Sequence, residues 1–254
     1  MISKNQVKAI RQLESKKFRK ERGLFVAEGP KVVGDLLEKT SAVTIVATDE
    51  WLQAHLTPAE TEVVCVSDDE LRRTSFLQHP QQVMATFRIP DLQTEPLTAA
   101  KHAIGRLCLA LDGVRDPGNL GTIIRIADWF GIETVICSHD SADSYSPKVV
   151  QATMGSIARV KVIVADLCAL IDALPADVPV YGTMLDGDNI YQTTLQNNGL
   201  LVMGNEGKGI SPEVALKLTH RLLIPNYPPE RATADSLNVA IATAIACAEF
   251  RRRE

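Results

Sequence analysis

Short apolar segments alternate with segments of helical pattern from residue 106 to the end of the sequence. The apolar segments have the length of strands, and the segments between them carry helical periodicity and capping residues. Apolar strands separated by helices are typical of a parallel sheet covered on both faces. The expected strands are 107–111, 134–137, 160–164, 180–184, 200–203 and 222–224, and the expected helices are 119–130, 147–154, 166–174, 212–219 and 236–252. The pattern predicts an α/β fold with a mostly parallel sheet over residues 106–254.

The first 90 residues show a second and smaller α/β pattern. Its expected elements are a helix at 4–15, a basic turn at 16–23, a helix at 30–38, and strands at 24–27, 43–48, 62–66 and 82–88. Ser67 and Glu70 have the spacing of a capping box, which predicts a further helix there. Prolines, threonines and a glycine indicate a linker over residues 91–105. We therefore expect two domains, residues 1–90 and 106–254.

Basic residues are concentrated near the N-terminus. The local charge from Lys4 to Arg22 is +6, although the whole chain carries −4. A basic segment on an acidic chain favours contact with a polyanion, but a solvated helix face would show the same run of charge. If the partner is RNA, the expected contacts are Lys4, Lys16, Lys17, Arg19, Lys20 and Arg22.

The cysteines and histidines are dispersed along the sequence, which argues against a metal site built from them. The five cysteines are odd in number and never spaced as Cys-x-x-Cys, which argues for reduced thiols in a cytoplasmic protein and against a zinc site. The five histidines form no ligand cluster, so we expect no metal. The first residues are polar and unlike a signal peptide, and the longest apolar stretch, 239–248, is too short to span a membrane.

Ligands of parallel α/β sheets bind outside the carboxyl ends of the strands, here loops 112–119, 204–211 and 225–236. In the first loop, Asn119 is the expected N-cap of the helix that follows, and Arg125 lies six residues further along. Capping alone would explain Asn119, and Arg125 could equally be a surface arginine. These two residues by themselves leave the function open.

The loop at 204–211 is rich in glycine, which lets a backbone approach a ligand and expose its N–H groups. It does not match a Walker A motif, because Lys208 is followed by Gly209 instead of Ser or Thr. It also lacks the Gly-x-Gly-x-x-Gly pattern of dinucleotide-binding proteins, so phosphate binding is not supported. A carboxylate at Glu206, directly after an apolar strand, is expected to have a partner.

The third loop leads from Ile224-Pro225 into a closing helix expected over residues 236–252. This helix is almost uncharged between residues 239 and 248, which predicts burial on nearly all sides. Ser236 is its expected cap. An amide in the first turn of such a helix needs specific hydrogen-bond partners, so we expect Asn238 to have them.

Together these stretches resemble the motifs of the SpoU/TrmH methyltransferases. The resemblance lies in Asn119-x-Gly121-x-x-x-Arg125, in Gly204-Asn205-Glu206-Gly207-x-Gly209-Ile210, and in Ile224-Pro225 followed by Ser236-Leu237-Asn238-Val239. It covers residues 106–252, while residues 1–90 look like the ribosomal-protein-like substrate-binding domain often fused to this family. The resemblance implies a C-terminal trefoil knot, S-adenosyl-L-methionine as cofactor, a homodimer, and methyl transfer to a ribose 2′-hydroxyl of RNA.

The resemblance also implies roles for individual residues. Arg125 would be the catalytic residue, supported by Asn119, Glu206, Ser236 and Asn238. The cofactor would be bound by Met203, Gly204, Asn205, Glu206, Gly207, Ile224, Pro225, Leu237 and Asn238. Because a guanidinium is too basic to accept a proton near neutral pH, we expect Arg125 to clamp the nucleotide electrostatically, with Glu206 orienting it.

The substrate is less constrained than the reaction. The basic segment and the N-terminal domain favour a large structured RNA, with ribosomal RNA first and transfer RNA second. Two rival hypotheses are a non-catalytic RNA-binding protein that keeps the knotted fold and a methyltransferase that acts on a base. The presence of Asn119, Arg125, Glu206 and Asn238 together argues against the first. Residues 226–234 depart from the family pattern, because they are longer than usual there and contain no glycine.

Overall fold

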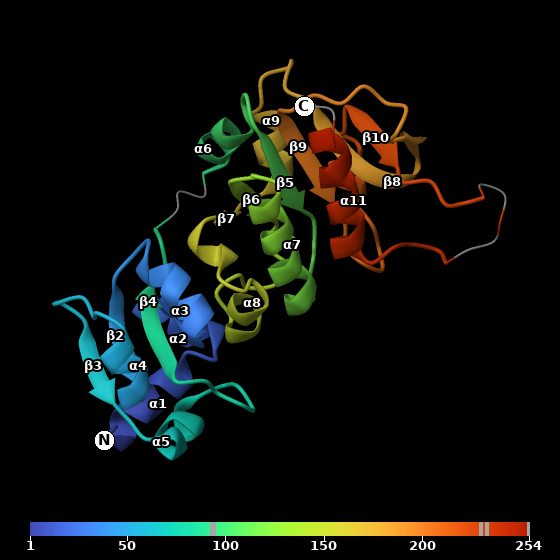
Figure 1. The fold of residues 1–254 in the computed structure, drawn as a ribbon. Helices are drawn as coiled ribbons and strands as arrows, with labels where there is room; N and C mark the ends of the chain where they lie inside the picture. The colour runs from blue at the N-terminus through green and yellow to red at the C-terminus, as the bar shows by residue number, and fades with distance from the viewer. Residues whose placement is uncertain (92–94, 229–230, 232–233, 253–254) are drawn as a thin grey trace. The chain divides into compact units, whose positions relative to one another are not determined.

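The two α/β patterns form two separate sheets in the computed structural model, which describes the whole chain except residues 92–94, 229–230, 232–233 and 253–254 (Figure 1). The chain divides into two compact units. Unit 1 contains Met1–Asp91 and Asp143–Arg159, and unit 2 contains Leu92–Ala142 and Val160–Glu254. Part of the expected 226–234 loop therefore lies outside the described residues.

Unit 2 is built on a 6-stranded sheet in the order β10-β8-β9-β5-β6-β7. Its strands are β5 (Leu107–Leu111), β6 (Thr134–Cys137), β7 (Lys161–Val164), β8 (Val180–Asn189), β9 (Gly199–Met203) and β10 (His220–Leu223). Every pairing between them is parallel, so the predicted parallel sheet is confirmed. Leu111 is in register with Met203, which brings the carboxyl ends of β5 and β9 side by side.

Helices cover both faces of this sheet (Figure 1). They are α6 (Pro96–Ala100), the 3₁₀ turn η1 (Lys101–Ala103), α7 (Pro117–Trp129), α9 (Leu167–Asp172), α10 (Pro212–Ala215) and α11 (Val239–Arg252). One core cluster joins α6, α9 and α10 to alternate strand residues such as Cys108 and Ala110. Helices α7 and α11 pack against each other. The expected linker is therefore partly core, because Ala99 and Ala100 of α6 are fully buried in that cluster.

The two helices that carry site residues begin at other residues than expected. Helix α7 starts at Pro117, and its N-cap is Asp116, whose carboxylate accepts the N–H of Asn119 at 2.8 Å. Proline is well tolerated in the first turn of a helix, where its missing N–H costs nothing. Helix α11 starts at Val239, so Ser236 does not cap it. Nor is α11 buried on nearly all sides, since Ile241 is 54% exposed.

Unit 1 has a 4-stranded sheet in the order β1-β4-β2-β3. Its elements are α1 (Lys4–Gln12), α2 (Lys16–Arg22), β1 (Leu24–Glu28), α3 (Pro30–Leu37), β2 (Ala42–Ala47), α4 (Asp49–Ala54), β3 (Glu62–Cys65), α5 (Asp68–Thr74), β4 (Val83–Arg88), α8 (Pro147–Ala152) and the 3₁₀ turn η2 (Ser156–Ala158). The capping box of Ser67 and Glu70 is confirmed at the start of α5. The expected basic turn at 16–23 is instead helical, as α2.

Residues 143–159 belong to unit 1, although they lie far beyond residue 90 in the sequence. The ring of Tyr145 lies 4.9 Å from that of Phe25, measured between centroids. Arg159 pairs with Asp35 at 2.9 Å. Gly155 has a φ of +96°, and a Cβ there would lie 2.2 Å from the Asp35 carboxylate, so only glycine fits this approach. The sheet of unit 1 and the segment 143–159 thus share one packed structure.

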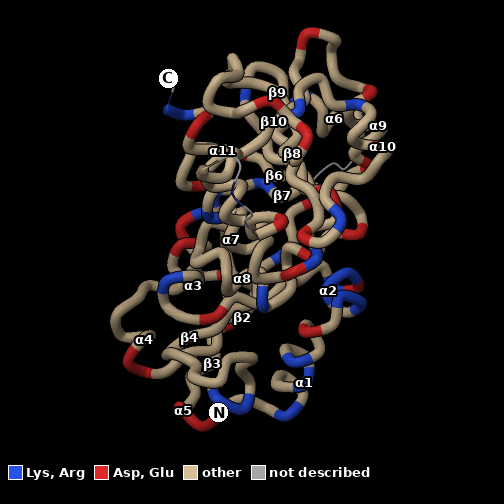
Figure 2. Tube along the Cα trace, turned by 90° about the vertical axis from the view of Figure 1, so that its right-hand side faces the viewer, with Lys and Arg blue, Asp and Glu red and all other residues tan. Residues whose placement is uncertain are grey.

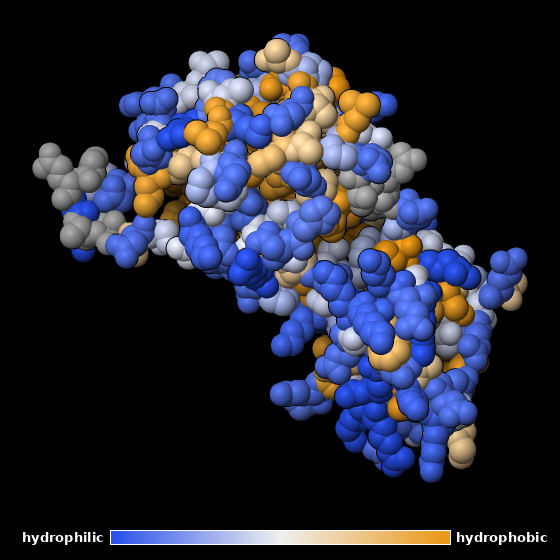
Figure 3. Space-filling view, turned by 180° about the vertical axis from the view of Figure 1, so that it is seen from behind, coloured by the Kyte–Doolittle hydropathy of each residue, from blue (hydrophilic) through white to orange (hydrophobic). Residues whose placement is uncertain are grey.

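Hydrophilic side chains predominate on unit 1 in the face shown in Figure 3, while unit 2 also presents hydrophobic patches there. Among the described residues, no helix is long and apolar enough to cross a membrane. The same residues contain no group of three or more His, Cys, Asp and Glu side chains that could hold a metal ion.

Candidate functional site

Hydrogen bonds between side chains join all three of the loops singled out from the sequence. Asn119, in the first turn of α7, donates its amide to Glu206 Oε1 at 2.9 Å. Asn238 in turn donates to Asn119 Oδ1 at 3.0 Å. Asn119 therefore lies between the other two residues. Its amide nitrogen donates to Glu206, and its amide oxygen accepts from Asn238. The chain of contacts Asn238–Asn119–Glu206 brings together residues more than 80 positions apart at the carboxyl edge of the sheet.

Asn238 has a second task, because its side chain caps α11. Its Oδ1 accepts the backbone N–H groups of Ala240 at 3.0 Å and Ile241 at 3.3 Å. Side-chain acceptors of this kind satisfy donors that a helix N-terminus leaves open. The cap was expected at Ser236, but Asn238 provides it. One amide therefore fixes both the start of α11 and the position of Asn119.

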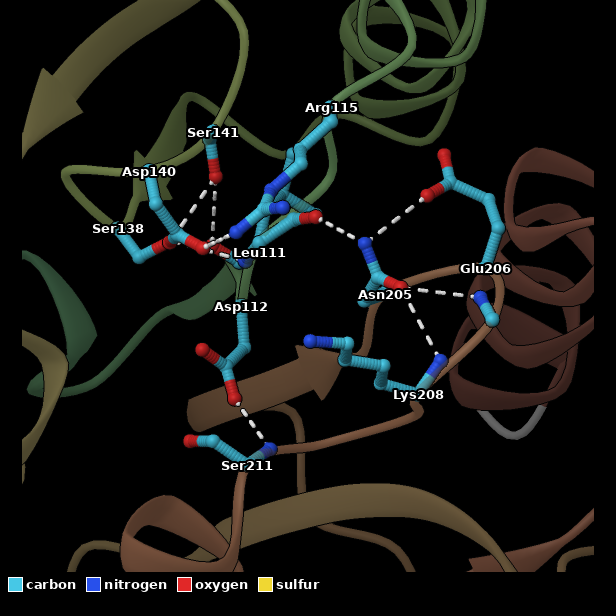
Figure 4. A network of polar contacts seen from close by, with 12 residues as sticks. Leu111, Asp112, Arg115, Ser138, Asp140, Ser141, Asn205, Glu206, Lys208 and Ser211 are labelled. Atoms are coloured by element: carbon cyan, nitrogen blue, oxygen red, sulfur yellow. Dashed lines mark hydrogen bonds and ion pairs between the residues drawn. The ribbon is translucent and has the colours of Figure 1, made fainter.

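The glycine-rich loop is closed on itself by Asn205 (Figure 4). Asn205 Oδ1 accepts the N–H groups of Gly207 at 3.0 Å and Lys208 at 3.1 Å. The backbone of Asn205 exchanges two further hydrogen bonds with Gly209, each of 2.9 Å. The expected exposure of N–H groups toward a ligand is therefore wrong for Gly207, Lys208 and Gly209, whose donors are used inside the loop. A phosphate would find little to bind here.

The first loop is held from its other side by residues after β6. Ser138 Oγ accepts the N–H of Gly113 at 2.8 Å and donates to Asp140 Oδ1 at 2.7 Å. Arg115 pairs with Asp140 at 2.8 Å (Figure 4). The hydrogen bonds from Arg115 and then from Ser138 hold the pKa of Asp140 below its usual range. Asp140 is therefore a carboxylate near neutral pH. Ser138 and Asp140 directly follow the expected strand 134–137, but they were not predicted as site residues.

Arg125 is exposed on α7, and its guanidinium has no hydrogen bond or ion pair with any described residue. We expected Glu206 to orient it. Instead, Glu206 accepts from Asn119 and, at 3.4 Å, from Asn205. Arg125 is thus free to contact an external group, and Glu206 serves to bind the loops together.

The residues expected to bind a cofactor lie at the same edge and are largely apolar. Met203 is buried at the end of β9, Ile224 and Pro225 are half-buried after β10, and Leu237 is 49% exposed. Ser236 is exposed and makes no hydrogen bond with a described residue. Apolar walls with a few backbone polar groups suit an adenine ring. Because the loop donors are already used by Asn205, this set of groups fits a nucleoside cofactor that carries no phosphate.

The basic residues of unit 1 divide into exposed and engaged side chains. Lys4, Lys16, Lys17 and Lys20 are exposed along α1 and α2, where Figure 2 shows the basic residues. Arg22 is exposed but donates to the Ala9 carbonyl at 2.9 Å. Arg19 is buried, pairs with Asp143 at 2.7 Å, and donates to the carbonyls of Leu13 and Glu14. Because its guanidinium is buried and already bonded, the placement of Arg19 does not support the expected contact with RNA.

Two family models match the chain. The SpoU rRNA Methylase family matches residues 106–248, which is more than half of the sequence. The chain belongs to this family. An MRM3-like substrate binding domain matches residues 4–85.

Relatives of known name and structure support the assignment over the full length. The 23S rRNA (guanosine(2553)-2′-O)-methyltransferase RlmP of Bacillus subtilis is 34% identical over 96% of this chain and 95% of its own. A putative RNA methyltransferase of the TrmH family from Porphyromonas gingivalis is 42% identical with a TM-score of 0.87, and each chain is covered to 100%. The AdoMet-bound rRNA methyltransferase from Sinorhizobium meliloti is 34% identical with a TM-score of 0.86, covering 100% of this chain and 97% of its own. The trefoil knot expected from the resemblance stays a prediction.

The double task of Asn238 makes a prediction about stability. Asn238→Ala removes the cap of α11 and should lower the free energy of unfolding by about 1 kcal/mol. Asn238→Asp keeps an oxygen for the N–H groups of Ala240 and Ile241, so it should cost clearly less, although it can no longer donate to Asn119. Denaturant unfolding of both variants measures the difference. Equal losses in the two variants would contradict the capping role.

Proposed function

We propose that this protein is an S-adenosyl-L-methionine-dependent methyltransferase that modifies a ribose 2′-hydroxyl of RNA, with ribosomal RNA as its substrate. The observation that carries the proposal is the chain of hydrogen bonds Asn238–Asn119–Glu206, which assembles the three loops at one edge of a parallel sheet. A protein that only bound RNA would not need this polar chain. The names of the relatives from Bacillus subtilis and Sinorhizobium meliloti support rRNA over tRNA.

The residues of this edge would divide the work between cofactor and substrate. Met203, Gly204, Ile224, Pro225 and Leu237 would hold the cofactor by apolar contact and backbone groups. The cofactor supplies a methyl group on a sulfonium, ready for in-line attack. The protein must then stabilise the charge that develops on the attacking ribose oxygen.

Arg125 is the group best suited to that task. Its guanidinium is exposed and unengaged by any described residue, and it is always charged near neutral pH. It would bind the nucleotide's phosphate and stabilise the developing oxyanion, without taking the proton itself. Asn119 and Glu206 would keep α7 in place relative to the loop at 204–209 and so fix where Arg125 is presented.

Calorimetric titration with S-adenosyl-L-methionine separates these roles. The wild-type protein should bind saturably, and Glu206→Ala should weaken binding by about tenfold, because the loop loses its bond to Asn119. Arg125→Ala should bind with unchanged affinity but transfer methyl groups at least about 100-fold more slowly. Nucleoside analysis of the treated RNA then distinguishes ribose from base methylation. A folded wild-type protein that binds no cofactor would favour the non-catalytic RNA-binding hypothesis instead.

Unit 1 would supply sequence-independent contacts to RNA phosphates through Lys4, Lys16, Lys17 and Lys20. Deleting residues 1–90 is a poor test, because it would strip the packing partners of Tyr145 and Asp143. We predict that replacing Lys16, Lys17 and Lys20 by Glu weakens RNA binding and reduces the slope of log K against log salt by about one per lost phosphate contact. Lys39→Glu, an exposed lysine of the same unit, is the matched control. An unchanged slope in the triple variant would remove this surface from the proposal.

We also propose a homodimer, with a second copy covering the outer side of α7 and α11. Trp129 is 85% exposed on α7 and Ile241 54% exposed on α11, and the two helices pack together. Exposed large apolar groups on neighbouring helices are typical of an association surface. Trp129→Glu should give a monomer in sedimentation equilibrium, whereas Leu216→Glu, equally exposed at the residue that follows α10, should not. A wild-type monomer would contradict the dimer.

The free cysteines support a proposal about the cellular location. All five cysteines are free, and burial raises the pKa of Cys108, Cys137 and Cys247 to about 12. Unpaired and unreactive thiols suit a reducing compartment, so we propose the cytoplasm. Detection of the protein in an oxidising compartment after cell fractionation would contradict this.

A further inference from the structure

We infer that Asp112 is a positioning residue for cofactor binding, which holds the loop at 204–211 through the backbone N–H of Ser211. The inference rests on the proposed function, because it concerns the same loop. Asp112 directly follows β5 and is 9% exposed. Neither the capping chemistry of its own loop nor the chain Asn238–Asn119–Glu206 involves it.

Asp112 bonds the loop at both of its ends, and Figure 4 shows the bond to Ser211. Its N–H donates to the carbonyl of Met203 at 2.9 Å, where β9 ends and the loop begins. Its carboxylate Oδ2 accepts the N–H of Ser211 at 2.6 Å, where the loop ends and α10 begins. The first bond continues the β5–β9 ladder, in which Leu111 is in register with Met203. The bond to Ser211 is made by the side chain of Asp112, so it is lost when that side chain is removed.

Gly113 adds an anchor between these two points. Its carbonyl accepts the side-chain amide of Asn205 at 2.7 Å. Gly113 has a φ of +72°, and a Cβ there would approach Asp140 to 3.2 Å, so this backbone position is strongly restricted to glycine. Two consecutive residues after β5 thus hold the start, the middle and the end of the loop.

The loop has two other attachments. Glu206 accepts the Asn119 amide at 2.9 Å, and the side chain of Ile210 is buried in the core cluster with α10. Residues 206–209 are exposed, and their internal bonds through Asn205 close the turn without attaching it to the sheet. On the outgoing side, the bond to Ser211 ties the backbone of the loop to the end of β5. A carboxylate is a strong acceptor for a backbone N–H, and this bond is 2.6 Å long. Loss of this bond should loosen the backbone around Ser211, next to the buried Ile210.

Asp112 also lines a cavity of about 270 Å³, together with Ser138, Asp166, Ser211 and Glu213. A second carboxylate on the same cavity offers a matched control. Glu213 is exposed and makes no hydrogen bond with a described residue. Glu213→Gln removes a negative charge from the cavity but leaves the Ser211 anchor intact.

The test compares Asp112→Ala, Asp112→Asn, Ser211→Pro and Glu213→Gln in the full-length protein. Ser211 has a φ of −60°, which proline adopts, so Ser211→Pro removes the same bond from its donor side. The proline Cδ takes the place of the N–H hydrogen and displaces the Asp112 carboxylate, a repulsion that is absent when Asp112→Ala is combined with it. We expect Asp112→Ala and Ser211→Pro each to weaken S-adenosyl-L-methionine binding about ten- to a hundredfold, and to speed amide hydrogen exchange across 204–211. Asp112→Asn keeps an accepting oxygen and should recover most of the affinity. Glu213→Gln should match the wild type.

The double variant separates positioning from general destabilisation. If the two residues act through one bond, Asp112→Ala combined with Ser211→Pro should bind no more weakly than the worse single variant. Multiplying losses, or unchanged exchange and affinity with only a lower Tm, would overturn the inference. A wild-type protein that fails to bind the cofactor would instead refute the proposed function. Hydrogen exchange of the loop is measured without cofactor, so it still reports whether Asp112 holds Ser211.

Discussion

The meeting of parallel strand ends at one edge of the sheet is the constraint on which the site depends. It places β5 beside β9, and β10 lies parallel in the same sheet, so three loops distant in sequence start at one edge. Asn119 then needs only two side-chain bonds to connect the loop of β9 with the start of α11. The sheet brings the three loops to one edge, and the side-chain amides of Asn119 and Asn238 fix the loops relative to each other. Neither would suffice alone, because loops without the sheet lose too much entropy to meet.

Most of the fold was predictable because each element has a local signature. The apolar runs predicted the strands of unit 2, although β8 continues from its expected end at residue 184 to Asn189, and the capping pair Ser67–Glu70 marked α5 correctly. The helices α4 and α6 were not predicted. Errors arose where one local signal competed with another. Asp116 and Pro117 together begin α7 before Asn119, and Asn238 outcompetes Ser236 as a cap because it also has Asn119 to bond.

What could not be predicted is long-range. No local pattern marks residues 143–159 as part of unit 1, because the contacts that place them there are with distant residues. Asp143 pairs with Arg19, and Tyr145 packs against Phe25. The same holds for Arg19, which looks like its basic neighbours in sequence but is buried against Asp143. Hydrogen bonds join Asn119, Glu206 and Asn238, three of the residues that the resemblance implied, while their roles in catalysis stay a prediction. The resemblance missed Asp112, although a carboxylate just after a buried strand is itself a signal.

Asn205 makes the glycine-rich loop after β9 differ from a phosphate-binding loop. Phosphate loops leave consecutive N–H groups unpaired and pointing at the ligand. Here the side chain of Asn205 takes the donors of Gly207 and Lys208, and its backbone takes that of Gly209. The glycines therefore serve a tight self-closed turn. With these donors already used, the turn offers few N–H groups to a phosphate, which agrees with a nucleoside cofactor that carries none.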